Sequence, residues 1–247
     1  MPIIRAAFWA MLLLTPGAFP ETAAADEGDA IMTVVMEKCP GAAKFILRGH
    51  PDLASLEKSE SQAKEVAQAS SPSLVYPALR DELLEMSRKD QAARLGDMST
   101  PEAWNRLSAV DAANLARLKQ IVLEKGFPDA AMVGRDGFNA AWLLVQHADP
   151  DPAFQQDMLE LLMEKHLIEG EQLALLTDRV LRAQGKPQRY GSQFTEEDGR
   201  QVPQPIEEPV EQLDQRRAAI GMMSFADYQC AMDVTYLARK NLVRKKP

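Results

Sequence analysis

The residues best suited to chemistry are Gln146 and His147, which follow directly on an apolar stretch. Residues 138–145 are apolar on nearly every side of a helix, a pattern typical of a helix that is buried all round. A buried polar side chain costs on the order of 1 to 3 kcal/mol unless it is hydrogen-bonded. We therefore expect both side chains to have partners or to face a cavity. His147 is either a general base or acid near neutral pH, or a structural histidine paired with a carboxylate or carbonyl.

Asp90 and Arg94 supply a second pair of charged groups. They are spaced i, i+4 and continue the apolar stripe of Leu79, Leu83 and Met86, so the buried face of that helix ends in charges. They form either a helix-end ion pair or a charged wall of a pocket. In the second case Arg94 could hold an anionic ligand through its planar set of donors.

Two further aspartates could orient the imidazole of His147. Asp178 lies beside Arg179, off the main apolar stripe of its predicted helix. It either pairs with Arg182 on the surface, which would contribute little stability, or it positions His147, as carboxylates beside a functional histidine do. Asp149 is the other candidate for this role.

A β-hairpin is predicted after these helices. Two extended segments, residues 188–194 and 200–204, flank an Asp-Gly turn, which is a strong short-range hairpin pattern. Side chains alternate along a strand, so Gln188 and Tyr190 should point the same way. Together with Gln193 they form either a lid or amide-rich rim over a pocket, or part of an ordinary surface hairpin.

The rest of the chain predicts helices that hold these residues in place. Apolar periodicity and capping patterns indicate an all-α, multi-helix single domain with one small β-hairpin near residues 188–204. Ser108 is expected to cap the second helix, and Asp151 with Pro152 to begin the fourth. Apart from that fourth helix, the predicted ranges are about 77–96, 108–126, 136–148, 171–184, 208–220 and 225–242.

The N-terminus resembles a secretory signal peptide. Arg5 precedes a short apolar run, residues 6–14, and small residues follow at Ala23 to Ala25. The run is short for a bilayer span, which needs about 20 residues, so cleavage is favoured over a membrane anchor. We expect an exported protein, periplasmic or extracellular, without a stable membrane span after cleavage. The predicted division is signal peptide 1–25, N-terminal extension and linker 26–76, main helical domain 77–236, and basic C-terminal tail 237–247.

Composition narrows the partners and cofactors. A formal net charge of -8 disfavours nonspecific nucleic-acid binding. Cys39 and Cys230 form either a disulfide, as an even count in an exported protein indicates, or two separate buried thiols. We expect no metal, because His50 and His166 do not form metal-ligand spacing with His147. Nucleotide-binding glycine motifs are absent from the sequence, so no cofactor is expected.

An ordered set of short motifs runs through the predicted domain. Its members are Asp90-Gln91 with Arg94, Asp111 with Asn114, Gly126-Phe127-Pro128, Val133-Gly134, Trp142 with Gln146-His147-Ala148-Asp149, Asp178-Arg179, Gln188 with Tyr190-Gly191-Ser192-Gln193, Pro205-Ile206-Glu207, Arg216-Arg217 and Ile220-Gly221. Over roughly residues 78–230 this set resembles the bacterial domain of unknown function numbered 6624. Ser192 stands where that family has Thr, which keeps the hydroxyl.

The resemblance implies a shared fold and a shared site, and it names no activity. The residues placed in that site as ligand-binding candidates are Asp90, Gln91, Arg94, Trp142, Gln146, Arg179, Gln188, Tyr190 and Gln193. Two hypotheses follow. The first is a binding or scaffold domain of the cell envelope, with a small molecule or an envelope protein as its partner. The alternative is a metal-independent hydrolase or transferase in which His147 is the base and Asp149 or Asp178 orients it.

Overall fold

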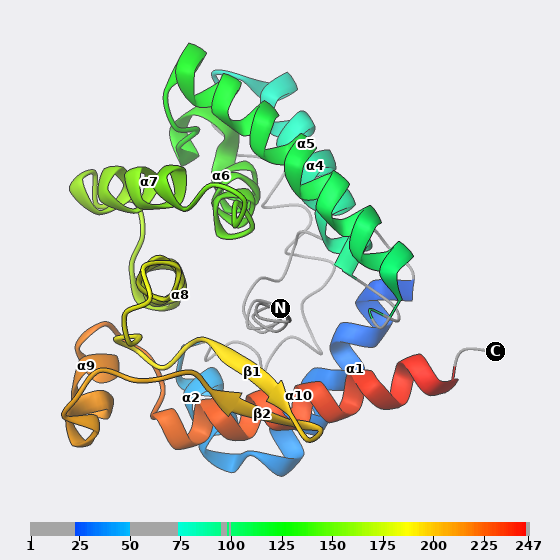
Figure 1. The fold of residues 1–247 in the computed structure, drawn as a ribbon, viewed down its shortest axis with the longest axis vertical. Coiled ribbons are helices and arrows are strands. Elements are labelled where there is room, and N and C mark those ends of the chain that lie inside the picture. Colours follow the sequence, from blue (N-terminus) through cyan, green and yellow to red (C-terminus); the bar gives the residue numbers. More distant parts are fainter. Residues whose placement is uncertain (1–22, 50–73, 95–97, 99, 246–247) are drawn as a thin grey trace, which may run out of the picture.

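The computed structural model describes residues 23–49, 74–94, 98 and 100–245 (Figure 1), and over these residues the chain is mostly helical with one two-stranded hairpin. The predicted fold class is therefore confirmed. In chain order the elements are α1 Ala23–Lys38, α2 Pro40–Gly49, α4 Pro77–Arg94, α5 Pro101–Lys125, α6 Ala130–Gln146, α7 Pro152–Glu164, α8 Gly170–Ala183, β1 Phe194–Glu197, β2 Arg200–Pro203, the 3-10 turn η3 Val210–Gln212, α9 Leu213–Ala219 and α10 Phe225–Lys245.

Most of the predicted signal peptide and the predicted linker lie outside the described residues, so their boundaries stay predictions. Within the described part of the chain, no helix is long and apolar enough to cross a membrane. The helix α10 continues to Lys245, so most of the predicted basic tail is the last part of this helix.

The main hydrophobic core surrounds α6. Its side chains from Ala140 to Val145 are all buried, as the apolar run predicts. The helices α4 and α5 lie side by side along one flank of α6, and α7 and α8 follow on the other (Figure 1). Residues 140–145 of α6 are therefore packed among apolar neighbours on all sides.

The start of α6 shows why its predicted beginning lies further along the chain. Asp129 caps the first turn by accepting hydrogen bonds from the backbone N–H groups of Ala131 and Met132. Gly134 then breaks the helix with φ 75° and ψ 166°, a conformation that favours glycine. The long buried segment begins after this break, close to the predicted start at residue 136.

The prediction that Ser108 caps the next helix is wrong. The helix α5 begins two turns earlier, where Thr100 accepts a hydrogen bond from the backbone N–H of Ala103 and Pro101 occupies the first turn. Proline fits that turn because the missing N–H has no partner there in any helix. Asp111 consequently lies inside α5 and its carboxylate is available for another contact.

The predicted start of α7 is confirmed, because Asp151 accepts a hydrogen bond from the backbone N–H of Phe154 at 3.0 Å.

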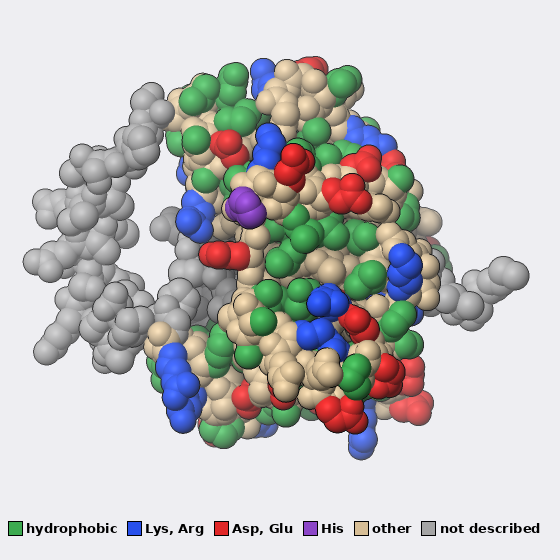
Figure 2. All heavy atoms as spheres, turned by 90° about the vertical axis from the view of Figure 1, so that its left-hand side faces the viewer, with side chains coloured by type: hydrophobic (Ala, Val, Ile, Leu, Met, Phe, Trp, Pro, Cys, Tyr) green, Lys and Arg blue, Asp and Glu red, His purple; other side chains and the backbone are tan. Residues whose placement is uncertain are grey.

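Figure 2 shows the side of the molecule on which α7 and α8 lie. Acidic and basic side chains are interspersed there, and apolar side chains gather across the middle of the face. Met163 is one exposed apolar residue at the end of α7.

The hairpin is confirmed but its strands are shorter than predicted. β1 and β2 pair antiparallel from Phe194 with Pro203 to Glu197 with Arg200. Residues 188–193 form a loop instead of a strand, and only Gln188 makes a bridge, to Ile206. The expectation that Gln188 and Tyr190 point the same way from one strand therefore does not apply.

A second hydrophobic cluster joins the N-terminal helices to α10. Val35, Ile46, Phe194 and Tyr228 are among its buried members. Of the two alternatives for Cys39 and Cys230, the structure shows the disulfide, with Cα atoms 5.9 Å apart. A bridge across a sequence separation of 191 residues would contribute about 5 kcal/mol in the chain-entropy model. The helices α1 and α2 are thus tied to the last helix both covalently and by packing.

Candidate functional site

His147 and Asp90 form a buried pair at the C-terminal end of α6. His147 Nδ1 lies 2.7 Å from Asp90 Oδ2, and the two side chains are 8% and 0% exposed. The contact exists because α4 packs along α6, which brings the last turns of the two helices together. Burial acts to raise the pKa of Asp90, but His147 and Arg94 outweigh it and hold the pKa below 3.8.

Burial and Asp90 together determine the protonation state of His147: burial favours the neutral ring, and Asp90 selects the nitrogen that carries the proton. Burial is the main cause that lowers the pKa of His147 below 6.5, and the charges of Arg94 and Arg179 add to it against the opposing effect of Asp90. His147 is therefore neutral at pH 7. Since the ionised carboxylate of Asp90 can only accept, Nδ1 carries the proton and Nε2 carries the lone pair.

Arg94 extends this pair into a chain of charges. Its Nη1 donates to Asp90 Oδ1 and its Nη2 to Asp111 Oδ1, both at 2.6 Å. Burial, with contributions from Asp90 and Asp149, raises the pKa of Asp111 to about 6 in spite of Arg94. The predicted ion pair of Asp90 with Arg94 is thus present, and Arg94 is engaged by two carboxylates.

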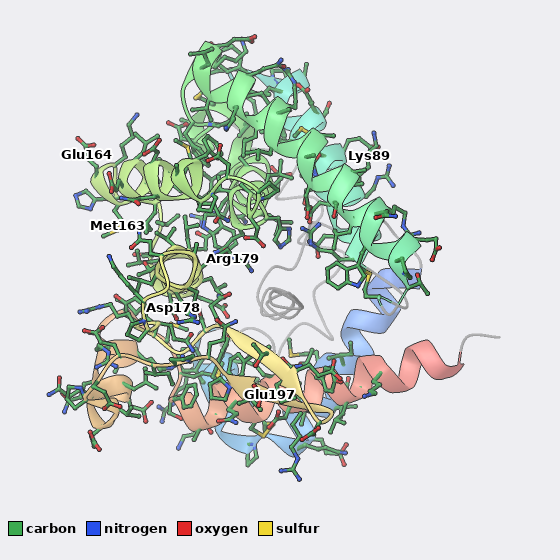
Figure 3. All side chains as sticks on the ribbon, viewed as in Figure 1. Lys89, Met163, Glu164, Asp178, Arg179 and Glu197 are labelled. Carbon is green, nitrogen blue, oxygen red and sulfur yellow. A yellow bond between two sulfur atoms is a disulfide. The ribbon has the colours of Figure 1, made fainter. Side chains whose placement is uncertain are left out.

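Gln146 belongs to a second set of contacts beside the first. Arg179 Nε donates to Gln146 Oε1 at 2.9 Å, and Arg179 Nη1 lies 2.8 and 2.9 Å from the two carboxylate oxygens of Asp149. Figure 3 shows Arg179 pointing from α8 toward α6. Gln155 donates to Asp149 Oδ1 at 3.2 Å and to the carbonyls of Val145 and Gln146 at 3.1 Å. Two charged networks therefore meet at the end of α6.

We call these residues the α6 cluster: Asp90, Arg94, Asp111, Gln146, His147, Asp149 and Arg179. Its two halves are electrostatically coupled, since Arg179 lowers the pKa of His147 and Asp149 raises that of Asp111. Among the described residues, no group of acidic, histidine or cysteine side chains could hold a metal ion.

The amide of Gln146 keeps an unused donor. The Nε2 group of Gln146 is buried and has no hydrogen-bond partner in the described part of the chain. Rotating the amide would not help, because Arg179 Nε must meet an oxygen and Oε1 already provides it. Asn114 Nδ2 on α5 and Trp142 Nε1 on α6 are buried donors in the same situation. Such groups are rare in folded proteins and indicate a missing acceptor.

Asp178 does not contact His147 or Arg182, contrary to both predicted roles. It is fully buried and accepts backbone hydrogen bonds from Arg189 at 2.7 Å and from Tyr190 and Ser192 at 2.9 Å. Figure 3 shows it on the side of α8 that faces this loop. Arg182 donates to Gln204 and to a backbone carbonyl instead. The carboxylate that orients His147 is Asp90, and Asp149 pairs with Arg179.

The predicted rim residues Gln188 and Gln193 are also internal. Gln188 Nε2 donates to the carbonyls of Gln193 and Gln204, and its Oε1 accepts from the backbone N–H of Gln193. Gln193 Nε2 donates to Ser192 Oγ at 3.1 Å. We call Asp178, Gln188, Gln193 and the loop of residues 188–193 the loop scaffold. Tyr190 packs in a small apolar cluster beside it.

The structure thus gathers part of the predicted ligand-binding set. Asp90, Gln91, Arg94, Gln146 and Arg179 meet in the α6 cluster, where Gln91 donates to Asp90 at 2.8 Å. Sequence reasoning missed two members of these networks. Asp111 lies three residues after the expected cap Ser108, a spacing that suggests a local role, and Gln155 is a polar residue next to the apolar stripe of α7.

The fold and the cluster define a mostly helical domain with a small hairpin and a polar centre at the end of its buried helix. The chain belongs to the family of unknown function DUF6624, whose model matches residues 77–240. Neither the comparison with curated proteins nor that with solved structures finds a match.

Proposed function

We propose that the α6 cluster binds a small polar molecule through Gln146 and His147. The observation that carries this proposal is the unpaired amide nitrogen of Gln146. The residue is 3% exposed, and its Nε2 has no acceptor among the described residues. A buried donor without a hydrogen bond costs about 1 to 3 kcal/mol, and a ligand oxygen that accepts from it would remove this cost. The donors of Asn114 and Trp142 support the same interpretation.

The chemistry of the cluster favours a ligand that carries hydroxyl groups. Gln146 Nε2 offers a donor, and His147 Nε2 is the acceptor of the neutral imidazole. A hydroxyl group accepts and donates at once, so it suits both atoms. Three aspartates face two arginines in the α6 cluster, which leaves one net negative charge with His147 neutral. A neutral or cationic molecule is therefore favoured over an anion.

A second candidate function is catalysis on such a hydroxyl group. The contact of Asp90 with His147 favours it, because it keeps Nε2 as the basic nitrogen and stabilises the imidazolium that forms on proton transfer. In a hydrolase or transferase, His147 would take the proton of an attacking hydroxyl, and Asp90 would orient the imidazole in place of Asp149 or Asp178.

An envelope location is part of the proposal, and the disulfide between Cys39 and Cys230 is consistent with an oxidising, exported setting.

The test is a thermal-shift screen of the full chain against neutral sugars and polyols, with amines, nucleotides, peptides and organic acids for comparison. A neutral polyhydroxy compound that binds only the folded form should raise Tm in a concentration-dependent way. The Gln146→Met variant should lose this shift while its own stability changes by about 1 kcal/mol or less, because one hydrogen bond and one unpaired donor disappear together.

The matched control is Gln172→Met, which changes a half-buried glutamine that donates to Asn139. This variant should keep the ligand-induced shift. No stabilisation of the wild-type chain by any probe, or an equal shift in Gln146→Met, contradicts the proposed function. Catalysis is separated from binding by His147→Gln, with the exposed His166→Gln as its control, once a bound compound is known.

A further inference from the structure

Arg217 is a fully buried arginine outside the α6 cluster. It lies on α9, and its Nε donates to the carbonyl of Met223 at 2.8 Å and its Nη1 to that of Tyr190 at 2.6 Å. Within the described residues its Nη2 is buried without a hydrogen-bond partner. Two carbonyls neutralise less of its charge than a carboxylate would. The site therefore keeps a buried donor without an acceptor, on a guanidinium whose hydrogen bonds among the described residues go to carbonyls alone.

Tyr228 places a second unused donor beside the first. It lies on α10 with 1% of its surface exposed, and its ring centre is 4.6 Å from the guanidinium carbon of Arg217. Its hydroxyl group is also buried without a partner in the described structure. Two neighbouring donors that lack an acceptor point to one missing molecule with oxygen atoms.

Glu171 on α8 provides the third polar group. It shares one helix face with Ala174 and Asp178, and Asp178 accepts from the backbone N–H of Tyr190 while Arg217 donates to the carbonyl of Tyr190. This face of α8 and Arg217 therefore lie on either side of Tyr190. The charges of Glu171 and Arg217 act on each other, and among the described residues no ion pair or hydrogen bond joins them.

Apolar side chains surround the same place. Ala174, Tyr190 and Met222 form a small buried cluster with Ile220 packed against it. The backbone N–H of Met222 donates to the carbonyl of Arg217, which places Met222, a member of this cluster, next to the arginine. A molecule at this site would thus meet charge on one side and apolar surface on the other.

We propose that Arg217, Tyr228 and Glu171 form a second binding site, separate from the α6 cluster, for a short monocarboxylate with an apolar tail. One carboxylate oxygen accepts from Arg217 Nη2 and the other from Tyr228 Oη. The tail packs on Ala174 and Met222. A phosphate group would need more donors than the two available, and the negative charge of Glu171 would oppose a dianion.

Binding at this site takes up a proton. Burial raises the pKa of Glu171 to about 7 despite the charge of Arg217, and a bound carboxylate would raise it further. The charged and titratable groups around Glu171 are Arg217 and Tyr228 across the site and Asp178 on its own helix, with Asp214 acting on Arg217. The proton comes from solvent, so the affinity falls as the pH rises through about 7.

The experiment titrates the full, disulfide-bonded chain with acetate, propionate and butyrate at pH 6 and pH 8, and follows Tm and the heat of binding. Sodium chloride at equal ionic strength controls for ion effects. We expect saturable binding that is about 10-fold weaker at pH 8. Tyr228→Phe should weaken binding by roughly 10- to 100-fold, because a hydrogen bond to a charged group is lost. Glu171→Gln should remove the pH dependence.

Tyr236→Phe is the matched control on the same helix, since Tyr236 accepts a hydrogen bond from Lys240 and lies outside the site. It should bind like the wild-type chain. The proposal is overturned if chloride gives the same shift as the carboxylates, if Tyr228→Phe binds as well as Tyr236→Phe, or if no carboxylate binds and only a buried water fills the site. Should Tyr228→Phe fail to fold, the comparison of Glu171→Gln with the wild-type chain at the two pH values decides.

Discussion

Asp90 and Asp178 are both completely buried, yet their surroundings differ in kind. Asp90 contacts the side chains of His147, Arg94 and Gln91, and its pKa lies below 3.8. Asp178 accepts three backbone N–H groups of the loop scaffold, and burial raises its pKa above 3.8. A carboxylate held by the backbone sets the shape of a loop, whereas one held by charged side chains controls their protonation.

The buried glutamines show the same contrast. Gln188 uses both ends of its amide within the loop scaffold, while Gln146 leaves Nε2 unused at the end of α6. Burial of a polar residue therefore does not by itself indicate a binding site. The informative observation is which hydrogen bonds the surrounding protein leaves incomplete.

The largest effect is expected from Asp178→Ala. The change leaves three backbone N–H groups without this acceptor, two in buried hydrogen bonds and one in a part-buried one, and we expect the free energy of unfolding to fall by about 3 to 5 kcal/mol. Urea denaturation at pH 7 measures it, with Asp157→Ala, an exposed aspartate on α7, as the control that stays within about 0.5 kcal/mol. A loss below about 1 kcal/mol in Asp178→Ala would show that the loop does not depend on this carboxylate.

A smaller effect is expected from Asp111→Asn, and its sign depends on pH. The pKa of Asp111 is raised from 3.8 to about 6, so the folded wild-type chain binds this proton more tightly than the unfolded chain does. Stability from this group is present at low pH and is lost as the pH rises from about 4 to 6. Asparagine does not titrate, so the variant does not lose this stability. The difference in unfolding free energy, variant minus wild type, should therefore rise by roughly 1 to 3 kcal/mol across this range.

Urea titrations of both proteins at pH 4, 5, 6 and 7 measure this difference. It should level off toward pH 7, where the residue is mostly ionised in both states. A difference that stays constant from pH 4 to 6, or that changes in the opposite direction, would remove Asp111 from the charged network of the α6 cluster.

The helices could be predicted because their causes are local. A few neighbouring residues are enough to predict each of them, as with the apolar stripe of α4, the Asp151 cap before Pro152 and the end of α8 before Gly185. Ser108 shows the limit of this reasoning. It stands at a good capping distance from Asp111, but the side chain of Asp111 is used by Arg94, and Thr100 with Pro101 provides a competing start.

The site could be predicted only in part, because its partners come from distant segments. Gln146 and His147 stand out locally as polar residues after an apolar run. The partner of His147 is Asp90, 57 residues away, and it is selected by the packing of α4 on α6. Asp178 could not be assigned from side-chain types at all, since its partners are backbone groups of a loop.

The subtlest prediction concerns the proton on His147. Since burial lowers its pKa below 6.5 and the ionised Asp90 accepts from Nδ1, long-range proton–nitrogen NMR at pH 7 should show a neutral ring with the proton on Nδ1. Asp90→Asn should lower the pKa of His147 further, because the charge of Asp90 raises it, and should weaken the preference for this tautomer. Asp178→Asn, the matched change in the loop scaffold, should leave both unchanged. A charged ring at pH 7 would contradict the lowered pKa of His147. The same response in both variants would show that the protonation of His147 does not depend on the carboxylate that contacts it, and the two aspartates would then not differ in this respect.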